Sequence, residues 1–325
     1  MDYFPDRQHV RLRSLELGTY LHAAADGIEV GLHTDRASVT AAWTVHRYQN
    51  EHDNTYLLLH SAASGRYLAA ATNTRAPRGQ SGFRVEQREF DEPEVASIMW
   101  QVIRPGNFVL LRHVGANFLR ANGRRRFSWN SGVTVDKFQN MSTMMHWVVE
   151  PIPALQAYPG VPAPIAEPLS SPQFTCILFG RDPPPVRAIR FQRANDDGTF
   201  NEDGWREFQF TGSSSYRLLY ELIIRLDIVN FVMCVRAGRY ARLTPLLSNL
   251  PSGTGNTLYI VAIHNMTPVT VIVMAGNYFL LDRNLATTSL SVAAFLLDEA
   301  SDVIFDVVVL DSMGSVDQNF ALFMG

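Results

Sequence analysis

Three stretches of this sequence share one pattern, and together they decide the fold of its first half. Each stretch opens with an alternating apolar strand and passes through a short turn that contains a glycine. An aromatic residue, a leucine and, two positions later, an alanine then follow. The stretches are residues 10–23 (VRLRSLELGTYLHA), 57–70 (LLLHSAASGRYLAA) and 109–121 (VLLRHVGANFLRA).

The aromatic positions of these copies, Tyr20, Tyr67 and Phe118, are 47 and 51 residues apart. Alternation with period two indicates strands with one buried face, and the glycine supplies the positive φ of a tight hairpin. A single copy of about four short strands cannot bury its own apolar face, and a propeller needs four or more blades. Three copies that close around a pseudo-threefold axis therefore predict a β-trefoil over residues 1–150.

Each copy ends with a tryptophan in a strand-like context, which extends the set of residues expected in the shared core. Aromatic and leucine side chains from the three copies are expected to meet there, since no copy is stable alone. The predicted core aromatics are Tyr20, Trp43, Tyr67, Trp100, Phe118 and Trp147.

The bulk composition fits two soluble domains. The chain has 325 residues, of which 46% are apolar, and its net charge of −3 gives no global reason to expect nucleic acid or an anionic membrane as a partner. The first residues are too charged for a secretory signal, and no window has the apolar length of a membrane span. Two cysteines, Cys176 and Cys234, form neither a disulfide framework nor a zinc site. We therefore expect a cytoplasmic protein.

The second half begins with residues 151–185, which hold 10 of the 17 prolines. Proline at this density favours an extended linker, and a proline-rich ligand for aromatic-grooved domains is the alternative. Residues 186–263 then follow the order β-β-α-β-β-β of a ubiquitin-like α+β roll, with strands at 186–193, around 205–210, 231–235, 239–243 and 257–263. Serines at 213–215 offer N-caps to a helix that ends near Asp227. Residues 264–325 form an extension whose fold the pattern does not define.

The helix of this roll has one apolar face at helical spacing. The residues expected on that face are Tyr216, Leu219, Leu222, Ile223 and Leu226. The exposed surfaces expected to contact partners are the sheet face of the roll and its edge strand.

Several runs resemble a plant family catalogued as domain of unknown function 569. They are residues 10–14, 65–68, 117–123 and, more loosely, 127–136 in the trefoil, together with the acidic turn 195–198 and the later Trp205, Phe208 and Phe210. The first domain of that family is similar to the fascin-like trefoils, which cross-link actin. The resemblance implies a fascin-like trefoil followed by a ubiquitin-like domain, and filamentous actin as the protein partner.

The sharpest surface candidate is the run Arg124, Arg125 and Arg126 beside Trp129. Adjacent guanidinium groups next to an aromatic ring can hold an acidic protein face or a phosphate backbone. A solvated hairpin tip is the structural alternative. Arg11, Arg13, Arg112 and Arg120 are further basic residues whose positions the sequence does not give.

The tryptophans raise the possibility of a carbohydrate-binding trefoil. Sugar-binding trefoils of the ricin type carry a glutamine two places before the tryptophan of each copy. In this chain those places hold Ala41, Ile98 and Met145. The lectin signature is absent, which favours a core role for the tryptophans.

Catalytic and metal motifs are also absent from the sequence. The acidic run around Asp196 lacks the alternating ligands of a calcium loop, and the nine histidines lack metal-ligand spacing. No phosphate loop, nucleophile elbow or carboxylate pair occurs. We therefore expect a non-enzymatic protein-interaction module without a cofactor or metal. The alternatives are a carbohydrate-binding trefoil and an enzyme of unrecognised type.

Overall fold

The computed structural model describes residues 4–49, 53–91, 95–124, 127–153, 186–251 and 257–264. The predicted linker, apart from its first three residues, and the predicted extension beyond residue 264 lie outside these ranges. None of the helices in the described part of the chain has the length and apolarity needed to cross a bilayer.

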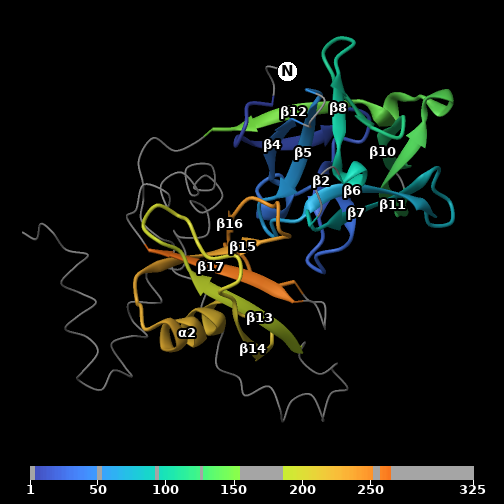
Figure 1. Ribbon diagram of the computed structural model, residues 1–325. Coiled ribbons are helices and arrows are strands. Elements are labelled where there is room, and N and C mark those ends of the chain that lie inside the picture. Colours follow the sequence, from blue (N-terminus) through green and yellow to red (C-terminus); the bar gives the residue numbers. More distant parts are fainter. Residues whose placement is uncertain are drawn as a thin grey trace, which may run out of the picture. The chain divides into compact units, whose positions relative to one another are not determined.

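The first half contains twelve strands (Figure 1). They are β1 (His9–Ser14), β2 (Tyr20–Ala23), β3 (Val30–His33), β4 (Trp43–Gln49), β5 (Thr55–Ser61), β6 (Tyr67–Arg75), β7 (Phe83–Arg88), β8 (Trp100–Ile103), β9 (Leu110–His113), β10 (Asn117–Arg124), β11 (Phe127–Lys137) and β12 (Trp147–Ile152).

Six of these strands close into a barrel. Antiparallel pairing runs from β12 to β1, then to β4, β5, β8 and β9. Val109, next to β9, returns to Trp147 of β12 through two backbone hydrogen bonds of 2.8 and 3.0 Å. The remaining strands form three hairpins, β2–β3, β6–β7 and β10–β11. A closed barrel with three hairpins is a β-trefoil, which confirms the fold predicted for this half.

The tryptophan of each copy occupies the same place in the core. Trp43, Trp100 and Trp147 are fully buried. Each indole Nε1–H donates to the carbonyl oxygen of the leucine that follows the aromatic residue of a copy: Leu21, Leu68 and Leu119, at 3.1, 2.9 and 3.0 Å. The buried indole donors are thus satisfied within the trefoil, as a buried tryptophan requires.

The aromatic residues Tyr20, Tyr67 and Phe118 are buried, but they do not share the central core. The barrel core contains the leucine next to each of them, whereas Tyr67 and Phe118 belong to separate clusters outside it. Successive side chains of a strand point to opposite faces, so a leucine that faces inward places the preceding ring on the outer face. The expectation that these rings meet in one core was therefore wrong.

One glycine of the repeat was also misassigned. Gly18 and Gly65 have φ of 70° and 71° two residues before the aromatic, as expected. In the third copy that position is Ala116, with φ of 63°, and Gly115 precedes it. A non-glycine residue in the left-handed region costs about 1–2 kcal/mol.

The described residues of the second half form a five-stranded sheet with the helix α2 (Ser215–Leu226) packed on one face (Figure 1). The strand order is β14-β13-β17-β15-β16, with β13 and β17 parallel. The strands are β13 (Val186–Arg193), β14 (Arg206–Thr211), β15 (Phe231–Arg236), β16 (Thr244–Pro245) and β17 (Leu258–His264). This β-β-α-β-β-β roll agrees with the predicted ubiquitin-like topology.

Three details of the roll differ from the prediction. The fourth strand is the short β16, because residues 239–242 contact the trefoil instead, whereas Leu243 packs in the roll. Leu218 is fully buried on α2, whereas Tyr216 is only partly covered and contacts Tyr220. The sheet face opposite α2 is also closed, since Cys234 and Val261 are fully buried there. That face was predicted as a contact surface, and its burial corrects the prediction.

Candidate interaction surface on the trefoil

The strand registers define three equivalent corners on the outer face of the trefoil. Tyr20, Tyr67 and Phe118 pair across their hairpins with His33, Arg88 and Asp136. Two residues after each partner lies a second equivalent position. We call these the first, second and third corners, and their residues at this position are Asp35, Phe90 and Phe138.

The barrel strands complete each corner with a cross-strand pair. Arg11 lies opposite Glu150 at the first corner, Leu58 opposite His46 at the second, and Leu110 opposite Ile103 at the third. The three corners therefore differ in chemistry: the first is charged, the second is mixed and the third is apolar.

The second corner is covered by the roll, within one compact unit. Phe90 N–H donates to the Ala237 carbonyl at 2.8 Å, and its own carbonyl accepts from Tyr240 N–H at 2.8 Å. Phe90 stacks edge-on against Tyr67 with ring centroids 5.5 Å apart and is 1% exposed. A Cβ on Gly238 would lie 2.5 Å from the Phe90 backbone, so only glycine allows this approach.

Polar contacts complete this docked corner. Arg242 forms a bidentate ion pair with Asp6 at 2.9 and 3.0 Å, and its backbone N–H donates to the Tyr67 hydroxyl at 3.3 Å. The same hydroxyl lies 3.0 Å from His46 Nδ1. Burial, assisted by the Arg242 charge, lowers the pKa of His46 to about 4, and burial raises the pKa of Tyr67 to about 12. Both groups are therefore neutral at pH 7.

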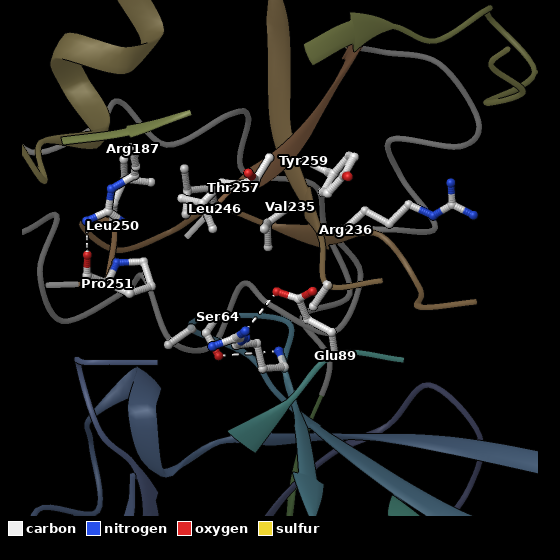
Figure 2. A pocket seen from close by; sticks show the side chains of 14 residues that line it. Ser64, Glu89, Arg187, Val235, Arg236, Leu246, Leu250, Pro251, Thr257 and Tyr259 are labelled. Carbon is white, nitrogen blue, oxygen red and sulfur yellow. Dashed lines mark hydrogen bonds and ion pairs between the residues drawn. The ribbon is translucent and has the colours of Figure 1, made fainter. Parts of the chain in front are cut away.

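A narrow crevice lies between the trefoil and the roll, beside further hydrogen bonds of Thr244 with His60 and of Ser248 with the Ala63 carbonyl. Figure 2 shows Ser64 and Glu89 from the trefoil facing Val235, Leu246 and Pro251 from the roll. Its cavity volume is about 20 Å³, which is room for about one water molecule. This crevice is a packing seam, and it is too small for a ligand.

At the first corner, charged side chains pair with one another. Glu150 accepts from Arg13 Nε at 2.9 Å and from Arg36 Nε at 2.8 Å. The Tyr20 hydroxyl lies 3.4 Å from the same carboxylate. Burial alone would raise the pKa of Glu150, but the two guanidinium groups outweigh it and hold the pKa below its usual value. These partners occupy the Glu150 carboxylate, and Asp35 accepts a hydrogen bond from Ala37 N–H at 2.9 Å.

The third corner is apolar and open. Phe138 packs against Phe118 with ring centroids 5.7 Å apart, much as Phe90 packs on Tyr67, yet Phe138 is 58% exposed. Met141, three residues after Phe138, is 39% exposed. Ile103, which pairs with Leu110 of the cluster that contains Phe118, is 37% exposed. The Phe138 carbonyl accepts from Met141 N–H at 2.9 Å, so this corner presents side chains rather than free backbone.

The third copy is also strongly basic. Residues 100–146 contain seven basic side chains against the single acid Asp136, or +6, whereas residues 53–99 contain five basic and six acidic side chains, or −1. Arg112 lies opposite Phe118, and Lys137 precedes Phe138. Arg120 donates to the Asn140 carbonyl at 3.3 Å and lies 3.6 Å from Asp136. Arg112 and Arg120 thus lie next to the aromatic pair, and Lys137 is adjacent to the exposed Phe138 in the chain.

A cavity of about 280 Å³ lies next to this corner, lined by Arg104, Asn107, Phe108, Val109 and residues 147–149. Phe108 is stacked on His146, with ring centroids 3.7 Å apart and an angle of 15° between the planes. One face of the Phe108 ring is therefore covered by His146 and is not open to a ligand.

The predicted arginine run lies on the β10–β11 hairpin of the same copy. Arg125 and Arg126 fall outside the described residues, and Arg124 and Trp129 are described only as members of β10 and β11. Sequence reasoning missed the third corner, because Phe138 and Met141 lie outside the repeated motif. The pairing of Phe118 with Asp136 reveals this corner, because it places Phe138, two residues later, on the same face as Phe118.

The positions that carry a glutamine in ricin-type lectins hold buried apolar residues in this chain. Ala41, Ile98 and Met145 each end or lie in a 3-10 turn before a tryptophan, and all three are fully buried. In the described part of the chain, no group of three or more His, Cys, Asp or Glu could hold a metal ion. Burial raises the pKa of the Cys234 thiol, which keeps it protonated.

Comparison with known families agrees with this two-part architecture. The β-trefoil domain of unknown function DUF569 matches residues 1–150, and the DUF569-associated ubiquitin-like domain matches residues 185–263. The chain belongs to the DUF569 family. No curated protein matches it.

Solved structures with similar folds match the trefoil half of this DUF569 protein. A Caenorhabditis elegans protein with unknown function is 16% identical, with a TM-score of 0.39, over 46% of this chain and 97% of its own. The SDF2-like protein from Arabidopsis thaliana is 12% identical, with a TM-score of 0.38, over 45% and 94%. The Macrolepiota procera ricin B-like lectin, solved with lactose, is 15% identical, with a TM-score of 0.35, over 45% and 96%.

Proposed function

We propose that this DUF569 protein is a non-enzymatic protein-interaction module that binds a partner through the third corner of its trefoil. One observation carries the proposal: the aromatic pair that receives the roll at the second corner recurs at the third, where its outer ring, Phe138, is uncovered. Burying a phenylalanine side chain contributes about 1.5–3 kcal/mol, so the exposed Phe138, together with the exposed Met141 and Ile103, forms a surface that gains from a partner.

The second corner supports this interpretation, because it already works as a protein-docking surface inside the chain. Phe90 is covered by the roll, whereas the equivalent Phe138 is 58% exposed. A trefoil corner of this family member can therefore hold a folded segment against an aromatic pair. The third corner has the ring geometry for the same task and no covering element among the described residues.

Filamentous actin is the partner to test first, on the basis of the resemblance to fascin-like trefoils. Co-sedimentation of the full chain with actin filaments is the experiment. If actin binds at the third corner, Phe138→Asp lowers pelleting at least about tenfold, because a charge replaces the central ring. Tyr220→Asp on the exposed face of α2 is the matched control and leaves pelleting unchanged.

A second set of variants tests the arginine run. Changing Arg124, Arg125 and Arg126 together to Ala weakens pelleting if these side chains take part in binding. Unaltered pelleting by this triple variant removes the run from the site. Failure of the unmodified chain to pellet with filaments removes actin as the partner, and unchanged pelleting of Phe138→Asp removes the third corner.

Carbohydrate binding is the alternative function, and the cavity beside Phe108 is the one observation that favours it. Its volume of about 280 Å³ would admit a sugar ring. The buried Ala41, Ile98 and Met145 count against the lectin mode, because no polar group replaces the glutamine there. Saturable binding on a glycan array, lost on Phe108→Ala, would favour this alternative.

A further inference from the structure

We infer that the partner at the third corner is an acidic protein segment that carries apolar side chains. This inference rests on the proposed interaction function and adds the chemistry of the ligand. Two observations on the same surface support it: an exposed apolar centre and a basic surround.

The apolar centre of the third corner favours contact with the side chains of a partner rather than with its backbone. At the second corner the roll pairs with both backbone groups of Phe90. At the third corner the Phe138 carbonyl is already bonded to Met141 N–H. A partner therefore gains most by placing aliphatic or aromatic side chains over Phe138, Met141 and Ile103. Such a contact has the plan of an interface hot spot, with an apolar centre inside a polar rim.

The basic surround sets the charge of the partner. Arg112 and Lys137 have no ion-pair partner among the described residues. Arg120 is paired with Asp136, the only acid in residues 100–146. Glu16, an acid from the first copy, lies near His146 at the margin. The corner is thus positively charged as a whole, and a basic or neutral segment gains nothing from its rim.

Complementary charge at a rim raises the association rate and fixes the choice of partner, whereas the buried centre sets the lifetime of the complex. The two parts of the inference can therefore be separated. Removing the ring abolishes binding of every ligand of this site, while reversing the rim changes which ligand is chosen.

The test is selection from a phage-displayed library of random twelve-residue peptides on the immobilised full chain. The unmodified protein is expected to enrich peptides that combine acidic residues with aromatic or aliphatic ones. Phe138→Asp is expected to retain none of them, and Tyr220→Asp to retain them all. The double variant Arg112→Glu with Lys137→Glu is expected to lose the acidic preference and to weaken binding of the selected peptides about tenfold.

Folding of each variant is checked first by thermal unfolding. If Phe138→Asp does not fold, Phe138→Ala replaces it, because that change leaves a hole only at an exposed position. Raising salt from about 50 to 300 mM is expected to weaken the selected peptides on the order of tenfold, through screening of the rim charges.

The outcomes separate the inference from the function on which it rests. The inference is overturned, and the proposed function is retained, if the peptides whose binding depends on Phe138 carry no acidic residues. The same holds if those peptides bind the Arg112→Glu, Lys137→Glu variant as well as they bind the unmodified protein. Peptides that bind Phe138→Asp equally well overturn the third corner as the site. Self-association of the unmodified chain that Phe138→Asp abolishes, measured by sedimentation equilibrium, would put a second copy in place of the acidic segment.

Discussion

The second and third corners of the trefoil start from the same plan and end in opposite states. Both present an aromatic pair on the outer face, Tyr67 with Phe90 and Phe118 with Phe138. The outer ring of the first pair, Phe90, is buried under the roll, whereas the outer ring of the second, Phe138, faces solvent. The second corner therefore holds the roll, whereas the third corner leaves an apolar surface exposed. The comparison teaches that function in a repeated fold lies in the differences between copies.

The polar partners of the two pairs explain why the corners are not interchangeable. The Tyr67 hydroxyl contacts His46 and the backbone of Arg242, whereas Phe118 has no hydroxyl. The position equivalent to His46 at the third corner is the apolar Ile103, opposite Leu110. A segment such as residues 237–242 would lose its hydrogen bonds at the third corner. The second corner is therefore matched to the roll in a way that the third corner is not.

The largest expected effect comes from truncating the two equivalent rings. Phe90→Ala is expected to lower the free energy of unfolding by about 3–5 kcal/mol, because it leaves a cavity between the trefoil and the roll. Phe138→Ala is expected to cost less than about 1 kcal/mol, since that ring is largely in water. Urea denaturation measures both. Equal losses would show that the third corner is part of the core.

The next effect concerns the close approach of Gly238 to Phe90. Gly238→Ala is expected to cost about 2–4 kcal/mol, because the new Cβ meets backbone atoms that cannot move aside. Gly18→Ala is the matched control, with a positive φ of 70° and no heavy atom within 4 Å. It should cost only about 1–2 kcal/mol. A similar cost for both changes would mean that the roll is not tightly seated at the second corner.

Acid is expected to loosen the second corner before the third. His46 has a pKa of about 4 in the folded protein, below the value of about 6.5 in the unfolded chain. Between these values the unfolded state binds more protons, so stability is complete above pH 6.5 and is lost as pH falls toward 4. The loss attributable to this histidine is about 1–3 kcal/mol. Unfolding midpoints at pH 7 and pH 4.5, compared with those of His46→Gln, measure it.

The smallest effect concerns the turn of the third copy. Ala116 has the left-handed conformation that glycine has in the first two copies. Ala116→Gly is therefore expected to raise the free energy of unfolding by about 0.5–1 kcal/mol, with relief of strain partly offset by the greater freedom of glycine in the unfolded chain. Thermal unfolding checks the sign. A destabilised variant would indicate that the alanine methyl makes contacts that outweigh the strain.

Much of this architecture could be predicted from the sequence, because it follows from local patterns. The repeated strand-turn-aromatic motif and the Trp43, Trp100 and Trp147 positions predict the closed trefoil. The strand and helix periods after residue 186 predict the roll. The inward or outward direction of Tyr20, Tyr67 and Phe118 was mispredicted, because alternation does not say which face of a strand is the core.

The functional surface required the structure. Whether Phe90 or Phe138 is covered depends on where the roll docks, and that contact joins residues that are more than 100 positions apart. The short β16 and the buried sheet face of the roll have the same origin, since contacts with distant segments override the local pattern. The arginine run at 124–126 remains a prediction.

Amide hydrogen exchange on the full chain, with and without an acidic peptide retained through Phe138, tests the central claim most directly. We predict slower exchange in residues 101–112 and 136–141, at the third corner, and no change at the first corner around Arg13 and Arg36. Protection confined to α2, to β14 or to the first corner would contradict the claim that the open aromatic pair is the binding surface.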